Sequence, residues 1–278
     1  MAIPTVAGSF LLFWLGRVAG NRIVAVRARF VALAFGAAIA IPGLLFVVYY
    51  AHLFDGASWF YRFRSLPATE LSACGLGFMA GLAQAWLRPA AAPGKLVAPA
   101  VLLSLVLVPY AKPVLSPLAF DRPRTQPGDG TVLQSTFSTC GPASAATLLN
   151  LLGRPASEQE LARESFTSRG GTENWYLARA LRRRGLDVAF EIQPADSVVV
   201  PSPAIAGVVL RGGAGHFIAI LDSAGAEVTF VDPLEGKHTI KKADLAARYR
   251  LTGFFMVVQP RAESLLPDDR DGGPAQTL

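Results

Sequence analysis

Cysteine and histidine are scarce in this chain of 278 residues, which contains two cysteines and three histidines. Cys74 lies in an apolar run and Cys140 far along the chain, so their spacing indicates no disulfide framework. His52 and His238 form no metal-ligand pattern with cysteines or acids, so we expect no metal and no cofactor. We interpret Cys74 as a small packing residue, His52 as interfacial and His238 as an exposed strand residue.

Acidic residues are nearly absent from the first 115 residues, which hold two of them against nine lysines and arginines. The rest of the chain holds eighteen acids against seventeen basic residues, so the net charge of +6 arises in the first part. A hydrophobic fraction of 52% and a mean hydropathy of +0.39 are too high for an ordinary soluble protein. Basic residues between apolar runs are typical of the flanks of membrane spans. We therefore expect a lipid bilayer as a partner and no nucleic acid.

Uncharged stretches predict the membrane-spanning helices. Between Arg29 and Asp55 lie twenty-five residues without a charged side chain, more than the roughly 20 that a spanning helix needs. Runs at 71–87 and 96–111 are shorter, and their basic flanks can extend to the interface. Residues 1–16 are interpreted as a further span rather than a signal peptide, because the basic residue follows the apolar run instead of preceding it. The sequence thus predicts three to four helices.

Lysine and arginine also predict the orientation. Four arginines lie at 17–29, and Arg88 and Lys95 follow two crossings later. The positive-inside rule places both groups in the cytoplasm, so the last helix exits on the other side. We expect a multi-pass protein of the bacterial inner (cytoplasmic) membrane with an extracytoplasmic C-terminal domain.

Proline marks the boundary between the apolar and the soluble parts. Residues 1–111 form the predicted transmembrane region, and residues 112–130 hold four prolines that predict a linker. Residues 131–260 are long enough to bury a core of their own. Residues 261–278, rich in Asp, Gly and Pro, are predicted to be a disordered tail.

Helices precede strands in the soluble part. The first predicted helix opens with Pro142 and stops at Gly153, the second has a capping box of Ser157 and Glu160, and the third is capped by Thr172. A short helix, KADLAARYR, precedes the last strand. The predicted strands lie near 187–192, 204–210, 216–222, 226–231 and 252–259. This order predicts an α+β fold with helices packed on an antiparallel sheet.

Cys140 directly precedes Gly141 and Pro142, at the start of the first of these helices. Free amides and the positive end of the helix dipole at such a position favour a thiolate. A structural cysteine at a helix start is equally compatible with this position alone.

His216 begins HFIAILD and Asp232 ends EVTFVD, with a turn at residues 223–225 between them. Three-residue turns favour a left-handed glycine, which Gly225 supplies. A hairpin symmetric about Ala224 pairs His216 with Asp232 directly, so that the carboxylate can orient the imidazole. The alternatives are that the histidine only caps a strand and the aspartate only belongs to a turn.

The segments LQSTFSTCGPASAATLLNLLG, GHFIAILD and VTFVDPLEG resemble the double-glycine leader peptidase family, papain-like cysteine peptidases that process bacteriocin precursors. The resemblance covers about residues 131 to 260 and implies catalytic roles for Cys140, His216 and Asp232. It also implies that Gln134, six positions before the cysteine, helps form the oxyanion hole. The GGT sequence at 170–172 is similar to a glycine-containing loop of the family, although an ordinary loop and cap explain it equally well.

Two features depart from the family pattern. Thr139 stands where the family usually has an acid, and no GxxxxGK[ST] phosphate loop follows the domain in this sequence, so we do not expect the fused peptidase-transporter form. We therefore expect a membrane-anchored cysteine endopeptidase with a peptide or protein substrate and a possible separate transporter as a partner. The alternatives are a catalytically silent peptide-binding protein of the same fold and an enzyme that acts on another amide.

Overall fold

The computed structural model describes residues 2–49, 53–87, 92–120, 124–125, 129–194 and 198–261. The chain divides into two compact units, Met1–Pro117 and Leu118–Leu278. The interpretation of His52 and the predicted disorder of the tail beyond Arg261 lie outside the described residues.

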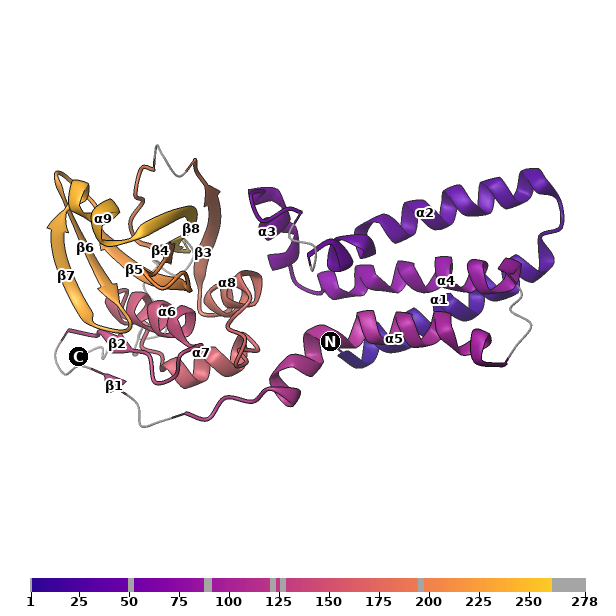
Figure 1. The fold of residues 1–278 in the computed structure, drawn as a ribbon, viewed down its shortest axis with the longest axis horizontal. Helices are drawn as coiled ribbons and strands as arrows, with labels where there is room; N and C mark the ends of the chain where they lie inside the picture. The colour runs from indigo at the N-terminus through magenta and orange to yellow at the C-terminus, as the bar shows by residue number, and fades with distance from the viewer. Residues whose placement is uncertain are drawn as a thin grey trace, which may run out of the picture. The chain divides into compact units, whose positions relative to one another are not determined.

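In the first unit, every regular element among the described residues is a helix (Figure 1). Its helices are α1 (Ala2–Arg22), α2 (Val26–Tyr49), α3 (Ser58–Ser65), the 3-10 helix η1 (Thr69–Ala73), α4 (Cys74–Leu87) and α5 (Ala92–Leu115). By length and composition, two helices among the described residues, α1 and α2, can cross a membrane. A third crossing is possible if α3 and the η1–α4 segment, which bend by 101° at their junction, count as one span.

Helix α4 packs closely on its neighbours because it carries glycines where backbones meet. A Cβ atom at Gly77 would lie 2.1 Å from the carbonyl oxygen of Ser9 in α1, and one at Gly75 would lie 1.9 Å from that of Ile39 in α2. Small residues permit such approach between apolar helices, whose association depends on close van der Waals packing. Cys74 also contacts α1, and its thiol donates to the carbonyl oxygen of Thr5 at 3.4 Å.

The second unit places three helices ahead of a sheet. The helices are α6 (Cys140–Leu151), α7 (Glu158–Glu164) and α8 (Asn174–Arg183). Two short strands, β1 (Arg124–Thr125) and β2 (Val132–Leu133), precede these helices, and β3 (Leu186–Ile192) follows them. A further helix, α9 (Lys242–Arg248), lies near the end of the unit. The remaining strands are β4 (Ala204–Val209), β5 (Gly215–Asp222), β6 (Glu227–Asp232), β7 (Gly236–Lys241) and β8 (Arg250–Pro260).

Six of these strands form one antiparallel sheet in the order β3-β8-β4-β5-β6-β7. The last strand, β8, therefore lies inside the sheet, between β3 and β4. Helix α6 packs on the central strands β4, β5 and β6 and is buried over most of its length (Figure 1). The predicted α+β fold class, with helices on an antiparallel sheet after an apolar helical region, is confirmed.

A second layer of packing covers the sheet near α9. Leu245 of α9 and Tyr249 join Ile218, Val228 and Phe230 in one buried apolar cluster. Burying such side chains stabilises the fold by roughly 1.5 to 3 kcal/mol each. This cluster fixes the end of α9 against strands β5 and β6.

Local predictions from the sequence had mixed outcomes. The capping box of Ser157 and Glu160 is confirmed. The predicted cap at Thr172 is wrong, because Glu173 precedes α8 and the Thr172 hydroxyl bonds to that of Thr167 at 2.8 Å. Strand β7 is not among the predicted strand ranges, although His238 was expected to lie in a strand; this histidine is half-buried rather than exposed.

Candidate active site

Cys140 is the first residue of α6, and its side chain is half-buried. The first amides of a helix have no acceptor within the helix, and the helix dipole makes that end positive. Pro142 fits there because its missing N–H would have no intrahelical acceptor. The sequence around Cys140 therefore places this residue where the helix begins and its amides lack intrahelical acceptors.

The loop before Cys140 is held by hydrogen bonds at both of its ends. The Ser135 amide donates to Oε1 of the buried Glu158 at 2.8 Å. The Thr139 hydroxyl accepts from the Thr136 amide at 3.2 Å and donates to the Thr136 carbonyl at 3.0 Å. Thr139, which replaces the acid expected from the family, is wholly buried and closes this turn.

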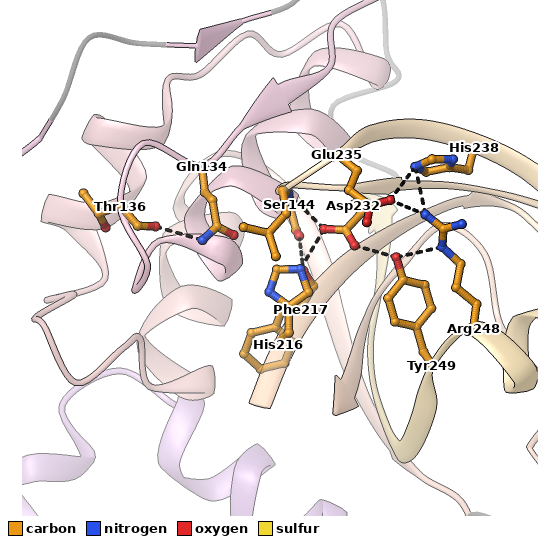
Figure 2. Close-up of polar contacts among 11 residues, drawn as sticks. Gln134, Thr136, Ser144, His216, Phe217, Asp232, Glu235, His238, Arg248 and Tyr249 are labelled. Carbon is orange, nitrogen blue, oxygen red and sulfur yellow. Dashed lines mark hydrogen bonds and ion pairs between the residues drawn. The ribbon is translucent and has the colours of Figure 1, made fainter. Parts of the chain in front are cut away.

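His216 and Asp232 contact each other, but not through the predicted register. Their side chains are almost completely buried, and Nε2 of the histidine lies 2.8 Å from Oδ1 of the aspartate (Figure 2). Strands β5 and β6 pair Ala219 with Val231 and Ile220 with Phe230, which differs by two residues from the expected pairing. The prediction that His216 stands directly opposite Asp232 is therefore wrong.

The two residues still meet because strand side chains alternate between faces with a period of two. A slip of two residues keeps His216 and Asp232 on the same face and makes them diagonal neighbours, within reach of long side chains. The slip has two sources. The turn between β5 and β6 has four residues instead of the expected three, and the strand pairing is irregular between Ile220 and Asp222. Gly225 has the expected positive φ, of 70°.

The Cys140 thiol also acts on the charge of His216. Because Nε2 faces Asp232, Nδ1 is left for the thiol. Burial favours the neutral imidazole, but hydrogen bonds to Asp232 and Cys140 and the charges of both partners raise the pKa of His216 to about 9. The imidazole is thus held in its protonated form at neutral pH, between two groups that are negative when ionised.

Helix α6 and strand β5 are held together beside this contact. The Ser144 hydroxyl donates to the carbonyl oxygen of Phe217 at 3.2 Å (Figure 2). A Cβ atom at Gly141 would lie 3.5 Å from the Phe217 ring, so the residue after the cysteine also packs on the residue after the histidine. These contacts keep the thiol close to the imidazole.

Asp232 accepts two hydrogen bonds besides that with His216. The Leu234 amide donates to Oδ1 at 2.8 Å, and the Tyr249 hydroxyl donates to Oδ2. Burial opposes the charge on Asp232, yet the bonds from His216, Tyr249 and Leu234 hold the pKa of its carboxyl below the usual range. Asp232 is therefore ionised at neutral pH, and this charge favours the imidazolium form of His216.

Gln134 lies at the end of β2 and is 6% exposed. Its backbone amide donates to the carbonyl oxygen of Pro233 at 2.9 Å, which ties it to the residue after Asp232. Its side-chain Nε2 donates to the carbonyl oxygen of Thr136 at 2.9 Å, within the loop that leads to Cys140 (Figure 2). An amide nitrogen has two N–H bonds, so this contact leaves one further donor.

The remaining candidates lie outside this constellation. His238 is in β7 and stacks on the ring of Phe230. The glycine-containing loop at residues 170–171 closes with two backbone hydrogen bonds between Ser168 and Gly171. Within the described ranges, no three His, Cys, Asp or Glu side chains gather in a group that could bind a metal ion.

Two residues that support the site were not predicted from the sequence. Tyr249 bonds to Asp232, and Glu158 bonds to Ser135 in the loop before Cys140; each partner lies far along the chain. Neither stands in a local pattern that indicates this contact. Only the buried tertiary packing of α7 and α9 reveals them.

A thiol at a helix start, a buried imidazole and a carboxylate bonded to that imidazole are the residue types that cysteine hydrolases use. Residues 130–263 match the model of the Peptidase C39 family. The chain belongs to this family.

Two curated relatives each match slightly less than half of the chain. An uncharacterized protein of Methanothermobacter thermautotrophicus is 30% identical over 133 residues, which cover 46% of this chain and 87% of the relative. An uncharacterized protein of Methanothermobacter marburgensis is 30% identical over 136 residues, which cover 48% of this chain and 90% of the relative.

Solved structures with similarity to the chain include the peptidase domain of Streptococcus ComA, a bifunctional ABC transporter of a quorum-sensing pathway. It is 20% identical, with a TM-score of 0.41, over 48% of this chain and 100% of that domain. A double-glycine motif protease from an AMS/PCAT transporter, in complex with its leader peptide, is 19% identical, with a TM-score of 0.40, over 50% of this chain and 99% of that protease.

Proposed function

We propose that the chain is a membrane-anchored cysteine endopeptidase in which Cys140, His216 and Asp232 catalyse cleavage of a peptide bond. The observation that carries this proposal is His216, which is buried, bonded to the Asp232 carboxylate, and raised in pKa by both this carboxylate and the Cys140 thiol. A protein that only binds peptides has no use for this arrangement.

The arrangement supports a two-step reaction. The Cys140 thiolate attacks the carbonyl carbon of the substrate, and the carbonyl oxygen takes up negative charge. The free N–H of Gln134 and the backbone amide of Cys140 stabilise this oxyanion. His216 then gives its proton to the leaving amine, the C–N bond breaks, and an acyl group remains on the sulfur.

Water completes the reaction. The neutral His216 removes a proton from a water molecule, which attacks the thioester carbonyl carbon. The C–S bond breaks, the carboxylic acid product leaves, and the thiolate and imidazolium are restored. Asp232 keeps Nδ1 of His216 directed at the sulfur throughout.

The position in a membrane is the second part of the proposal. The apolar length of α1 and α2 and the arginines at 17–29 support a multi-pass protein of the bacterial inner membrane with its domain outside the cytoplasm. A reporter fused after Pro260 tests the orientation, because activity of a reporter that works only in the cytoplasm would contradict it. Membership of a peptidase family supports a peptide substrate. We propose that a separate transporter delivers this peptide to the domain.

A thiol-reactive peptide probe tests the enzyme proposal directly in the full chain in detergent. We expect labelling at Cys140 that disappears in Cys140→Ala and falls sharply in His216→Ala. Cys74→Ala is the matched control, since the chain has only these two cysteines, and it should label like the wild type. Equal, slow labelling of the wild type and His216→Ala would instead favour a peptide-binding protein without activity.

Peptide products provide the second test. Membranes with the wild-type chain should release fragments that membranes with Cys140→Ala do not. Release of a product other than a cleaved peptide would assign the site to another amide.

A further inference from the structure

Both oxygens of the Asp232 carboxylate accept hydrogen bonds, but only Oδ1 contacts another member of the proposed catalytic trio. Oδ1 faces His216 and the Leu234 amide, whereas Oδ2 accepts from the hydroxyl of Tyr249 (Figure 2). Asp232 is 1% exposed and Tyr249 is 6% exposed, so solvent cannot readily replace this contact. The hydrogen bond from Tyr249 therefore restricts the rotation of the Asp232 carboxylate.

The direction of each hydrogen bond in this group follows from chemistry. Arg248 Nε lies 3.2 Å from the Tyr249 hydroxyl and can only donate. The tyrosine oxygen must then accept from Arg248 and give its single hydrogen to Asp232. Such chains polarise each bond in turn, so the bond to Oδ2 is strengthened by the arginine behind it.

The group is anchored on two elements. The Tyr249 amide bonds to the carbonyl oxygen of Leu245 at the end of α9, and its ring packs edge-on against Phe230, with the centroids 5.8 Å apart. Arg248 forms an ion pair with Glu235 in the turn after Asp232 and contacts Nε2 of His238 (Figure 2). The tyrosine hydroxyl is thus fixed independently of the histidine that Asp232 orients.

We propose that Tyr249, supported by Arg248, is a positioning residue that holds the Asp232 carboxylate with Oδ1 directed at His216. The catalytic consequence rests on the proposed peptidase function, because Tyr249 acts through Asp232 and does not touch the substrate. Without the hydroxyl, Oδ2 is buried with one donor fewer, and the carboxylate either rotates or takes up a proton more readily. Both changes weaken its hold on His216.

The test is Tyr249→Phe in the full chain, which removes one oxygen atom and keeps the ring on Phe230. We expect kcat to fall about tenfold with KM nearly unchanged, as for the loss of one hydrogen bond to a charged group. The acid limb of the pH profile should move to higher pH, because Asp232 is then protonated more easily. Tyr176→Phe, another buried tyrosine, is the matched control and should change neither.

A second measurement does not need peptidase activity. The difference in melting temperature between wild type and Tyr249→Phe should shrink as the pH is lowered from neutrality, because the hydroxyl stabilises only the ionised carboxylate. The difference for Tyr176→Phe should stay constant with pH. If no peptide is cleaved but the melting difference follows this pattern, the peptidase proposal fails and the positioning role stands.

Arg248→Met covers the case in which Tyr249→Phe does not fold. It should move the pH profile of activity in the same direction by a smaller amount, whereas Glu235→Gln, which leaves Arg248 Nε in place, should leave that profile unchanged. A Tyr249→Phe or Arg248→Met protein with the pH profile, kcat and pH-dependent melting of the wild type would overturn the inference.

Discussion

Nε2 of His216 lies 2.8 Å from Oδ1 of Asp232, although the two residues are offset by two positions between adjacent strands. A diagonal pair leaves the imidazole leaning along the strand rather than straight across it. The nitrogen that does not face Asp232 is then available to the first residue of α6. The contact thus depends on the face that the residues share and not on direct pairing.

Stability should depend on pH through His216. Its pKa is raised from 6.5 to about 9 in the folded chain, so the folded state binds a proton more tightly than the unfolded state. The resulting stability is fully present below pH 6.5 and is lost as the pH rises to about 9. Urea unfolding across this range should show the decline, and His216→Gln should lack it. Equal declines in both proteins would contradict the prediction.

Cys140→Ala should lower the pKa of His216 from about 9, because the thiol contributes both a hydrogen bond and a charge to that value. A smaller rise should persist through Asp232. Carbon-13 NMR of labelled histidines measures this, and with three histidines in the chain, His52→Gln and His238→Gln identify the signal. An unchanged midpoint would mean that Asp232 alone sustains the imidazolium.

Gln134→Ala should reduce kcat roughly a hundred- to a thousandfold and leave KM nearly unchanged, since an oxyanion donor acts mainly in the transition state. Steady-state kinetics on a cleaved peptide measure both quantities. The melting temperature of Gln134→Ala should be measured as a control, because loss of the bond from Gln134 to Thr136 could also lower kcat by destabilising the fold. A rise in KM at constant kcat would assign Gln134 to substrate binding instead.

Glu158→Ala should destabilise the fold by roughly 1 to 3 kcal/mol, because the buried Ser135 amide loses its acceptor. The loop that leads to Cys140 should loosen, and labelling of Cys140 by a peptide probe should slow. Glu158→Gln keeps an acceptor oxygen and should behave more like the wild type. Chemical unfolding and labelling rates check both effects, and equal behaviour of the Ala and Gln variants would contradict this role.

Gly77→Ala should destabilise the helical unit by roughly 1 to 3 kcal/mol, since the new Cβ atom would lie 2.1 Å from the Ser9 carbonyl oxygen. This outweighs the gain of about 1 kcal/mol that alanine brings to a helix. Gly56→Ala is the control, because nothing lies within 4 Å of a Cβ atom there. Thermal unfolding in detergent compares them, and equal midpoints would show that α1 and α4 can separate without cost.

Each member of the proposed trio lies in a strong local pattern of the sequence. Cys140 precedes a proline at a helix start, and His216 and Asp232 bound two apolar strands. Their contact survived an error in register because the error was an even number of residues. A slip of one residue would have separated them onto opposite faces.

Other features could not be predicted because they depend on distant parts of the chain. Tyr249 bonds to Asp232, 17 residues away in sequence, only because α9 folds back on strands β5 and β6. Thr172 fits a helix cap locally, but the hydroxyl of Thr167 takes its bond instead. In each case a tertiary partner competes with the local pattern and prevails.

The place of β8 between β3 and β4 has a consequence for synthesis on the ribosome. Every proposed catalytic group precedes Arg250, yet β3 gains its neighbour and β4 its second one only when residues 250–260 have emerged. A nascent or truncated chain that stops before this strand carries the thiol, the imidazole and the carboxylate on an unfinished sheet. The six-stranded sheet that carries these groups is therefore complete only after translation of the final strand.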